Sequence, residues 1–436
     1  MEGIKQVTFE LALKAATDRV VAHSDAFREE VLLVRDLIGR IRVVLPGKKF
    51  DYDGARLDKF SSELNQALGA YSYAPSTSIL FSAELFEGEH LFGSEDRRLI
   101  MREGDKRVWL LDRQIIGMDW GRAPMERKTN NSRVTFYGIK GGVGRSTALV
   151  VWAWWLAKHG KHVLIIDLDL ESPGVSSTLL PPEYLPDYGI VDWFVEDGIG
   201  QSEIVERSMV AASPVAANLP GAIRVAPAFG RDPVDYLPKL ARCYMDQPGK
   251  NPGSWGERLQ RMVEHLELLE QPDVVFLDSR AGLHDIAAVL VTRMGADAFL
   301  FAVDSAQTWT AYSFLFRSWK QHPRLTDFRE RLQMVAGMVP ETGREEYLAR
   351  FRERSWDLFR EHIYDEATVE NPDAFSFDLG SEEAPHYPLP ILWNRALQEF
   401  DPSLGVTGVD ERSALAALDG FIIEANKMVF PPEESA

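Results

Sequence analysis

The stretch "GIKGGVGRST" at residues 138–147 has the residue types and spacing of a phosphate-binding loop. The common form of this loop is G-x-x-x-x-G-K-[ST], in which the lysine contacts the β- and γ-phosphates. Here Arg145 stands at the lysine position, and a lysine, Lys140, lies five residues earlier. Glycines let backbone N–H groups turn toward an anion, and the Ser146 hydroxyl is a possible magnesium ligand. The loop therefore predicts a nucleotide site with an unusual cation arrangement.

The segments around this loop predict one strand–loop–helix–strand unit. "RVTFYGI" at 133–139 is β-rich, "ALVVWAWWLAKHGK" at 148–161 is an apolar helix that ends near Gly160, and "HVLIIDLDLESPG" at 162–174 is a buried strand followed by carboxylates. Such a unit implies parallel strands joined by a right-handed crossover. A later apolar run, "PDVVFLDSRAG" at 272–282, ends in Asp278. An aspartate at the end of an adjacent strand is typical of a magnesium–nucleotide site.

These motifs together resemble the ParA/MinD class of P-loop ATPases. "KGGVGRST" is similar to the deviant Walker A motif K-G-G-x-G-K-[ST]-T of that class, "LIIDLDLESPG" to its switch I segment D-x-D-P-Q-G, and "FLDSRAG" to its switch II segment D-T-P-P-G. "GAIRVAPAFG" resembles the strand that the family has between the two switches. The resemblance covers roughly residues 132–430 and implies a P-loop fold that binds ATP and Mg²⁺.

The resemblance also implies roles for individual residues. Lys140 would reach across a nucleotide-dependent homodimer to the phosphates of the partner subunit, and Asp169 would orient the attacking water. Arg145, the third candidate catalytic residue, departs from the motif; it would hold the β- and γ-phosphates in the ground state, and we expect slow hydrolysis because a guanidinium prefers two fixed oxygens. Ser146, Asp167 and Asp278 would lie near magnesium. The residues expected to line the phosphates are Lys140, Gly141, Gly142, Val143, Gly144, Arg145, Ser146 and Thr147.

The sequence departs from the family pattern at several of these positions. Besides Arg145, Glu171 replaces the usual glutamine of switch I, and Ser279-Arg280-Ala281 replaces Thr-Pro-Pro in switch II. The family often reads adenine with an asparagine after a late strand, but the corresponding segment here, "AGMVPETG", has none. Asn394 in "PLPILWNRAL" is interpreted as a loop or cap residue. The identity of the base therefore stays open.

The remaining pattern predicts a doubly wound, mostly parallel α/β sheet of about seven strands, because strands and helices alternate from residue 132 onward. Residues 1–131 predict a small α+β domain with helices over 11–40 and 55–69 and a hairpin at Gly104. The polar, turn-rich "GRAPMERKTNNSR" at 121–133 is expected to be the linker. We expect an interaction domain at 1–131, an ATPase domain at 132–430 and a tail at 431–436.

Composition limits the partners. Residues 1–131 carry 20 Lys+Arg and 21 Asp+Glu, a net charge of −1, and the remainder carries 28 and 45, a net of −17, which together give −18. Affinity for nucleic acid rests on Lys and Arg at phosphates, so DNA binding is not expected, and a protein partner at the N-terminal domain is. The single cysteine, Cys243, excludes an intrachain disulfide and a CxxC metal site. With no signal peptide and no membrane-spanning run, we expect a cytoplasmic protein.

Two function classes fit the sequence. The first is an ATPase switch in which ATP closes a dimer that engages a protein partner, and slow hydrolysis releases it. The second is a nucleotide-dependent scaffold or sensor without hydrolysis, for example a subunit of a bacterial regulatory or defence complex. Arg145 and the altered switch II favour the second, whereas Lys140, Asp169, Asp278 and Ser146 favour the first.

Overall fold

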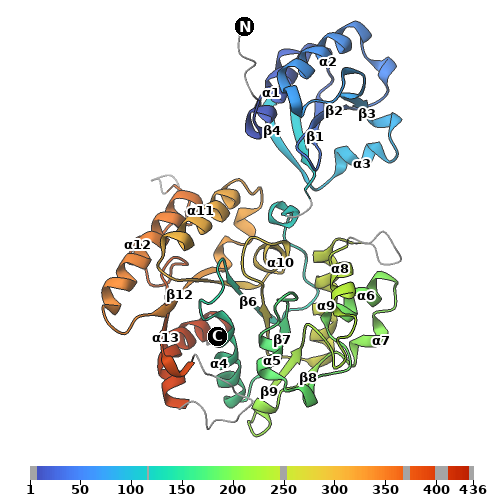
Figure 1. The fold of residues 1–436 in the computed structure, drawn as a ribbon. Helices are drawn as coiled ribbons and strands as arrows, with labels where there is room; N and C mark the ends of the chain where they lie inside the picture. Colours follow the sequence, from blue (N-terminus) through green and yellow to red (C-terminus); the bar gives the residue numbers. More distant parts are fainter. Residues whose placement is uncertain (1–6, 115–116, 246–252, 367–373, 398–410, 432–436) are drawn as a thin grey trace, which may run out of the picture. The chain divides into compact units, whose positions relative to one another are not determined.

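The computed structural model describes residues 7–114, 117–245, 253–366, 374–397 and 411–431. The chain divides into two compact units, Met1–Met118 and Asp119–Ala436 (Figure 1). This division lies before the border at 131/132 that the composition indicates. The intervening segment contacts the second unit: Arg293 Nε donates to Ala123 O (3.1 Å), and the backbone N–H of Lys128 donates to Glu264 Oε1 (2.9 Å).

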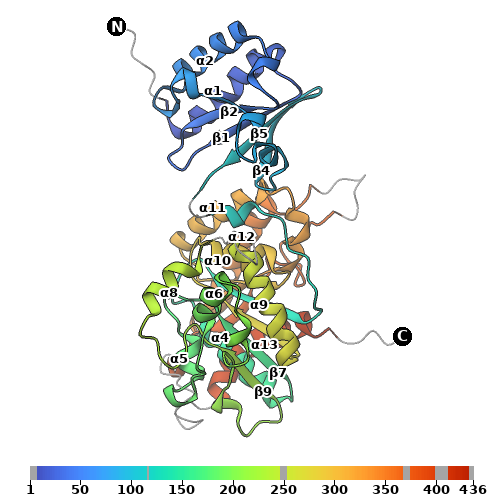
Figure 2. The ribbon, with the colours of Figure 1, turned by 90° about the vertical axis from the view of Figure 1, so that its right-hand side faces the viewer.

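The first unit is built on a five-stranded mixed sheet with the strand order β3-β2-β1-β5-β4. One face is covered by α1 and α2, whose Ala16 and Phe60 are fully buried against it (Figure 2). The expected hairpin forms at Gly104 (φ +57°) between β4 and β5. The elements are α1 (Phe9–Ala22), β1 (Glu30–Arg35), β2 (Ile41–Leu45), α2 (Gly54–Leu68), β3 (Ile79–Phe81), α3 (Gly88–Gly93), β4 (Arg97–Glu103) and β5 (Lys106–Asp112).

One expectation for the first unit is wrong. The apolar residues between 11 and 40 suggest a long helix, but α1 ends at Ala22 and residues 30–35 form the central strand β1. Leu32 and Leu33 are both fully buried, one on each face of the sheet. A short apolar run buried on both faces cannot be distinguished from a buried helix by periodicity alone.

The second unit is a doubly wound α/β fold, as the sequence predicts. Its eight-stranded sheet has the order β13-β12-β11-β6-β10-β7-β9-β8, and all neighbouring pairs are parallel except β8 with β9. The strands are β6 (Ser132–Gly138), β7 (His162–Asp167), β8 (Ala211–Ala212), β9 (Ala222–Ala226), β10 (Val274–Asp278), β11 (Asp297–Ala302), β12 (Leu332–Val339) and β13 (Leu389–Leu392).

Helices cover both faces of this sheet. On one face, α4 packs Trp152 (0% exposed) against Phe276 and Phe299, and α13 adds Phe421. The amphipathic C-terminal helix thus packs its apolar side into the core. The helices of the second unit are α4 (Arg145–Lys158), α5 (Val175–Leu179), α6 (Ile190–Gly198), α7 (Glu203–Glu206), α8 (Tyr236–Cys243), α9 (Trp255–Glu270), α10 (Asp285–Ala288), α11 (Ala306–Lys320), α12 (Arg344–His362) and α13 (Glu411–Val429). None of the helices in the described ranges is long and apolar enough to cross a bilayer.

Candidate functional site

The glycine-rich loop connects the end of β6 to the start of α4. Gly142 (φ +71°) and Gly144 (φ +84°) adopt left-handed backbone conformations, which glycine tolerates and other residues disfavour. Gly144 is the N-cap of α4 and has no side chain that could cap the helix. The first N–H groups of a helix and its dipole attract anions. Because Gly141 and Gly142 are exposed, this loop can receive a phosphate.

A close backbone contact fixes this loop against β12. A Cβ atom on Gly337 would lie 2.2 Å from the carbonyl oxygen of Val143, so only glycine fits there. The pairing of β12 with β13 is irregular between Ala336 and Val339, and Met338 has a φ of +53°. A β-bulge redirects the side chain at which it occurs. Here the irregularity places Met338 at the cavity beside the loop.

Carboxylates gather at the carboxyl ends of β7 and β10. Asp167 and Asp278 are register partners at the ends of these two parallel strands, so their backbones lie side by side. Arg145, the first residue of α4, is buried and places its guanidinium among the acids: Nε donates to Asp278 Oδ1 (3.0 Å) and Nη2 to Asp169 Oδ2 (3.4 Å). Arg145 thus joins the glycine loop to both carboxylate-bearing loops.

Burial changes the acidity of these groups. Burial raises the pKa of Asp278 to about 7, and the neighbouring Arg145 offsets only part of that effect. Burial likewise raises the pKa of Asp167 to about 6, against the lowering effect of hydrogen bonds from Ser176. The pKa of Asp169 is raised by burial as well, with Arg145 and Arg280 opposing the shift. Clustered groups with perturbed pKa values are typical of functional sites.

The oxygens of these aspartates are not equally available to a ligand. Asp167 Oδ2 accepts hydrogen bonds from the backbone N–H (2.9 Å) and hydroxyl (2.5 Å) of Ser176, and Oδ1 accepts one from the N–H of Asp169 (3.2 Å). By contrast, Asp169 Oδ1 and Glu171 Oε2 are buried and have no hydrogen-bond partner. A buried carboxylate oxygen without a partner is costly, which indicates that a ligand or ion completes the site.

This donor set fits Mg²⁺. Mg²⁺ binds oxygen ligands and is commonly held by one or two carboxylates together with substrate phosphates. Asp278 and Asp169 supply carboxylates close to the glycine loop, and Ser146 follows Arg145 in the first turn of α4. In the described part of the chain no group of three or more His, Cys, Asp or Glu side chains has the arrangement of a self-contained metal site.

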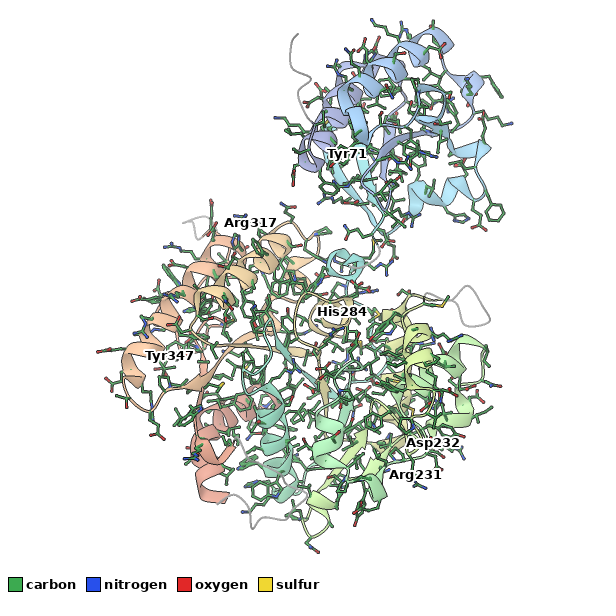
Figure 3. All side chains as sticks on the ribbon, in the orientation of Figure 1. Tyr71, Arg231, Asp232, His284, Arg317 and Tyr347 are labelled. Atoms are coloured by element: carbon green, nitrogen blue, oxygen red, sulfur yellow. The ribbon has the colours of Figure 1, made fainter. Side chains whose placement is uncertain are left out.

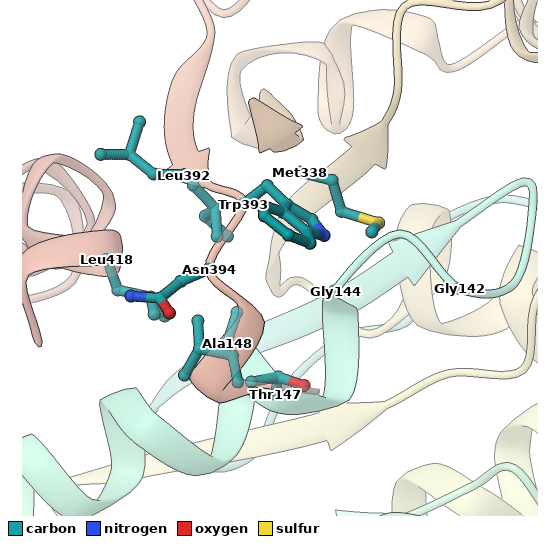
Figure 4. A pocket seen from close by; sticks show the side chains of 11 residues that line it. Gly142, Gly144, Thr147, Ala148, Met338, Leu392, Trp393, Asn394 and Leu418 are labelled. Atoms are coloured by element: carbon teal, nitrogen blue, oxygen red, sulfur yellow. The ribbon is translucent and has the colours of Figure 1, made fainter. Parts of the chain in front are cut away.

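A cavity of about 400 Å³ opens beside the glycine loop (Figure 4). One wall is formed by the loop and the first turn of α4, with Thr147 and Ala148, and the opposite wall by the segment after β13, with Trp393 and Asn394. The lining is mostly apolar, and Trp393 is 37% exposed. The full set of lining residues is Gly142, Gly144, Thr147, Ala148, Met338, Ile391, Leu392, Trp393, Asn394, Leu397 and Leu418.

Comparisons with known proteins agree with this geometry. Residues 134–308 match the family model described as the CobQ/CobB/MinD/ParA nucleotide binding domain. The matched residues lie within the second unit, and this part of the chain is similar to that nucleotide-binding domain. The match includes the glycine loop, the β7 carboxylates and Asp278, and it confirms the family resemblance of the sequence motifs and the fold class. No curated protein matches the chain.

Solved structures with a similar chain path include three proteins. A ParA family ATPase from Chlorobium tepidum TLS is 14% identical, with 69% of this chain and 95% of that chain covered and a TM-score of 0.39. A variant of Cyanothece McdA in complex with ATP is 12% identical, with 71% and 99% covered and a TM-score of 0.43. Cobyrinic acid a,c-diamide synthase from Mycobacterium smegmatis with ADP and magnesium is 15% identical, with 59% and 91% covered and a TM-score of 0.38.

The domain brings most of the predicted site residues to one sheet edge. Arg145 is in direct contact with Asp169 and Asp278, and Lys140 is exposed on the glycine loop. The sequence interpretation missed the apolar cavity wall, because β13 is a four-residue strand that contains a proline. Asn394, interpreted as a loop or cap residue, lines the cavity, although its backbone oxygen also closes a short turn with Leu397.

The raised pKa of Asp278 predicts a pH effect on stability. A carboxylic acid whose pKa is higher in the folded state than in the unfolded state destabilises the fold as the pH rises between the two values, here from about 4 to about 7. Asp278→Asn removes this group. In nucleotide-free, magnesium-free buffer, the stability of the variant relative to the wild type should increase by about 1–3 kcal/mol from pH 5 to pH 8.

Urea unfolding at several pH values measures this difference. The exposed Asp357→Asn is the matched control for the exchange of an aspartate for asparagine, since Asp357 pairs with Arg360 at the surface. A constant or falling stability difference for Asp278→Asn would show that Asp278 is ionised throughout this range.

Proposed function

We propose that the second unit binds ATP with Mg²⁺ and acts as a nucleotide-dependent switch. The observation that carries this proposal is the position of the glycine loop, which lines the apolar cavity and is followed directly by Arg145, the residue that contacts Asp278 and Asp169. A nucleoside triphosphate has the same sequence of chemical parts, namely an apolar base, an anionic chain and a bound cation. The match of residues 134–308 to a nucleotide-binding family supports this assignment.

The base would occupy the cavity between the first turn of α4 and the segment after β13. Trp393 offers a broad aromatic surface, and Met338 and Leu392 add apolar contacts (Figure 4). An aromatic ring stacked on a base is tolerant of base identity, since every base has a π-face. Asn394, which follows β13 and lines the same cavity, would supply an asparagine side chain next to the base.

The phosphates would lie on the glycine loop and the first turn of α4. Arg145 would then exchange part of its contact with Asp278 and Asp169 for phosphate oxygens, because a guanidinium binds two oxygens in a fork. Mg²⁺, when bound, would neutralise phosphate charge, with Asp278 and Ser146 as its protein ligands and Asp167 supporting the loop behind them. Asp169 would orient a water whose oxygen attacks the γ-phosphorus as the bond to ADP breaks, and the proton of the water ends on the released phosphate.

Lys140 has an intermolecular role in this proposal. It is exposed on the glycine loop, and Arg145 already supplies the cation within the same subunit. Lys140 would therefore contact the phosphates of a second copy across a nucleotide-dependent dimer. The near-neutral first unit would hold the protein partner of the switch, and the acidic second unit makes DNA a poor ligand.

A non-hydrolysing scaffold or sensor is the second candidate. The buried contacts of Arg145 favour it, because a guanidinium held by two carboxylates is less free to follow the charge that develops during phosphoryl transfer. Measuring phosphate release from ATP with and without magnesium separates the two candidates. Turnover well below the enzyme median of about 10 per second fits the switch, and none fits the scaffold.

Trp393→Ala should weaken the binding of ATP. Loss of one stacking contact costs about 1 kcal/mol, or about a fivefold increase in Kd. Equilibrium titration should show this increase for ATP but not for inorganic tripolyphosphate, which has no base. Trp356→Ala is the control, since Trp356 lies on α12 and donates to Phe377 O. Equal weakening of tripolyphosphate, or unchanged ATP binding, would place the base elsewhere.

Lys140→Ala should separate nucleotide binding from dimerisation. Sedimentation with a slowly hydrolysed ATP analogue should give a dimer for the wild type and a monomer for the variant, and both should be monomers with ADP. Lys158→Ala is the matched lysine control, because Lys158 lies at the far end of α4 from the glycine loop. A wild type that binds the analogue yet stays monomeric in both nucleotides contradicts the role of Lys140.

A further inference from the structure

The loops that follow β7 (residues 168–174) and β10 (residues 279–284) are joined by a charged pair. Arg280 Nη1 lies 2.6 Å from Glu171 Oε1, and the hydroxyl of Tyr244 donates to the same oxygen at 2.8 Å. One carboxylate oxygen thus receives a hydrogen bond from Tyr244, which follows α8, and an ion-pair contact from the β10 loop. We call Glu171, Arg280 and Tyr244 the Glu171 cluster.

The Glu171 cluster explains two of the departures from the ParA/MinD pattern as one feature. Glu171 stands where the family has glutamine, and Arg280 where it has proline. Either change alone would add an uncompensated charge to the edge of the nucleotide site. Glu171 is three-quarters buried and one of its oxygens already lacks a partner, so Arg280 supplies the charge that this position needs.

Further contacts attach α8 to the same two loops. The hydroxyl of Tyr236, the first residue of α8, donates to the carbonyl oxygen of Leu170 in the β7 loop. The ring of Tyr244 packs edge-on against His284 at the end of the β10 loop, with centroids 5.8 Å apart (His284 is labelled in Figure 3). Each end of α8 is therefore tied by a tyrosine to a loop that carries a carboxylate of the site.

Beyond compensating the charge of Glu171, the pair with Arg280 adds little to the stability of the fold. The Arg280 side chain is 37% exposed, and pairs of this kind contribute little to the stability of a fold. Their geometry does respond to new charges nearby. Arg280 lies two residues after Asp278, so a phosphate near the end of β10 would offer it a second, more highly charged acceptor. Because Arg280 and Tyr244 share Glu171 Oε1, a movement of Arg280 would change the charge that Tyr244 faces at this oxygen.

We propose that Glu171 is a positioning residue that couples the nucleotide site to α8 through Arg280 and Tyr244. This inference rests on the proposed nucleotide function. It specifies which contacts would transmit the presence of the nucleotide to α8. With a triphosphate bound, Arg280 shares its charge between phosphate and Glu171, and the contact that holds the C-terminal end of α8 weakens. The coupling requires two arrangements of one element that the ligand biases differently, which is the physical condition for allostery.

Hydrogen exchange of the full chain tests this coupling. Peptides that cover 234–244 are compared without nucleotide, with ADP and magnesium, and with a slowly hydrolysed ATP analogue and magnesium. In the wild type the analogue should make amide exchange in α8 about fivefold faster, because the weakened contact is equivalent to one hydrogen bond of about 1 kcal/mol. ADP, which lacks the γ-phosphate, should change it less.

Three variants separate coupling from simple packing. Tyr244→Phe keeps the ring but loses the hydroxyl, and it should abolish the α8 response. Because coupling between two sites is reciprocal, the same variant should bind the analogue as tightly as the wild type or up to about fivefold more tightly, measured by titration. Glu171→Gln should abolish the response too, whereas Arg280→Lys, which keeps the charge, should retain most of it. The control is Arg231→Gln, because Arg231, which is labelled in Figure 3, forms an exposed ion pair with Asp187 and its loss should leave the response intact.

The outcomes distinguish this inference from the proposed function. If the wild type does not bind the analogue, the nucleotide function and the coupling both fail. If the wild type binds it but α8 exchange does not change, or if Tyr244→Phe responds like the wild type, the coupling alone is wrong. Thermal unfolding of each variant verifies that a lost response does not come from a lost fold.

Discussion

The contact of Arg145 with Asp278 and Asp169 is the interaction on which the site depends. Asp278 is 1% exposed and Arg145 is 9% exposed, so neither charge has enough water to stabilise it alone. Removing either partner would leave a buried charge without compensation, which is far more costly than the pair itself. The arrangement therefore holds the glycine loop and the two carboxylate-bearing segments together. In the proposed function, a phosphate and a divalent cation would replace part of these internal contacts.

The sheet makes this contact possible. Parallel strands bring the ends of β6, β7 and β10 to one edge, so a residue that follows each strand meets the other two. The close approach of Gly337 to Val143 then fixes the position of the glycine loop relative to β12. At the same edge, the Glu171 cluster repeats the pattern of Arg145, with an arginine between loops and a carboxylate as acceptor. Arg145 thus connects the glycine loop to the ends of β7 and β10. Arg280 connects the loops after β7 and β10 to each other, and Tyr244 extends this contact to α8.

Much of this could be predicted from the sequence, because local patterns determine it. The glycine loop, the apolar runs of β6, β7 and β10 and the carboxylates that follow them specify the sheet edge and the family. Three features depended on tertiary contacts instead. Residues Glu30–Arg35 form a strand because they are buried on both faces of the sheet. The cavity wall at Trp393 depends on the pairing of the short strand β13 with β12. The ion pair of Glu171 with Arg280 joins positions that are far apart in the chain.

Calorimetric titration of the nucleotide-free protein with a slowly hydrolysed ATP analogue and magnesium tests the central claim most directly. The wild type should bind one analogue per chain, and Arg145→Ala should bind it more weakly by about 1.5–3 kcal/mol, roughly 10- to 150-fold in Kd, because a charged hydrogen-bonding partner of the phosphates is lost. Arg145→Lys should bind with an affinity close to that of the wild type. Absence of binding by the folded wild type, or equal affinity of wild type and Arg145→Ala, would contradict the account.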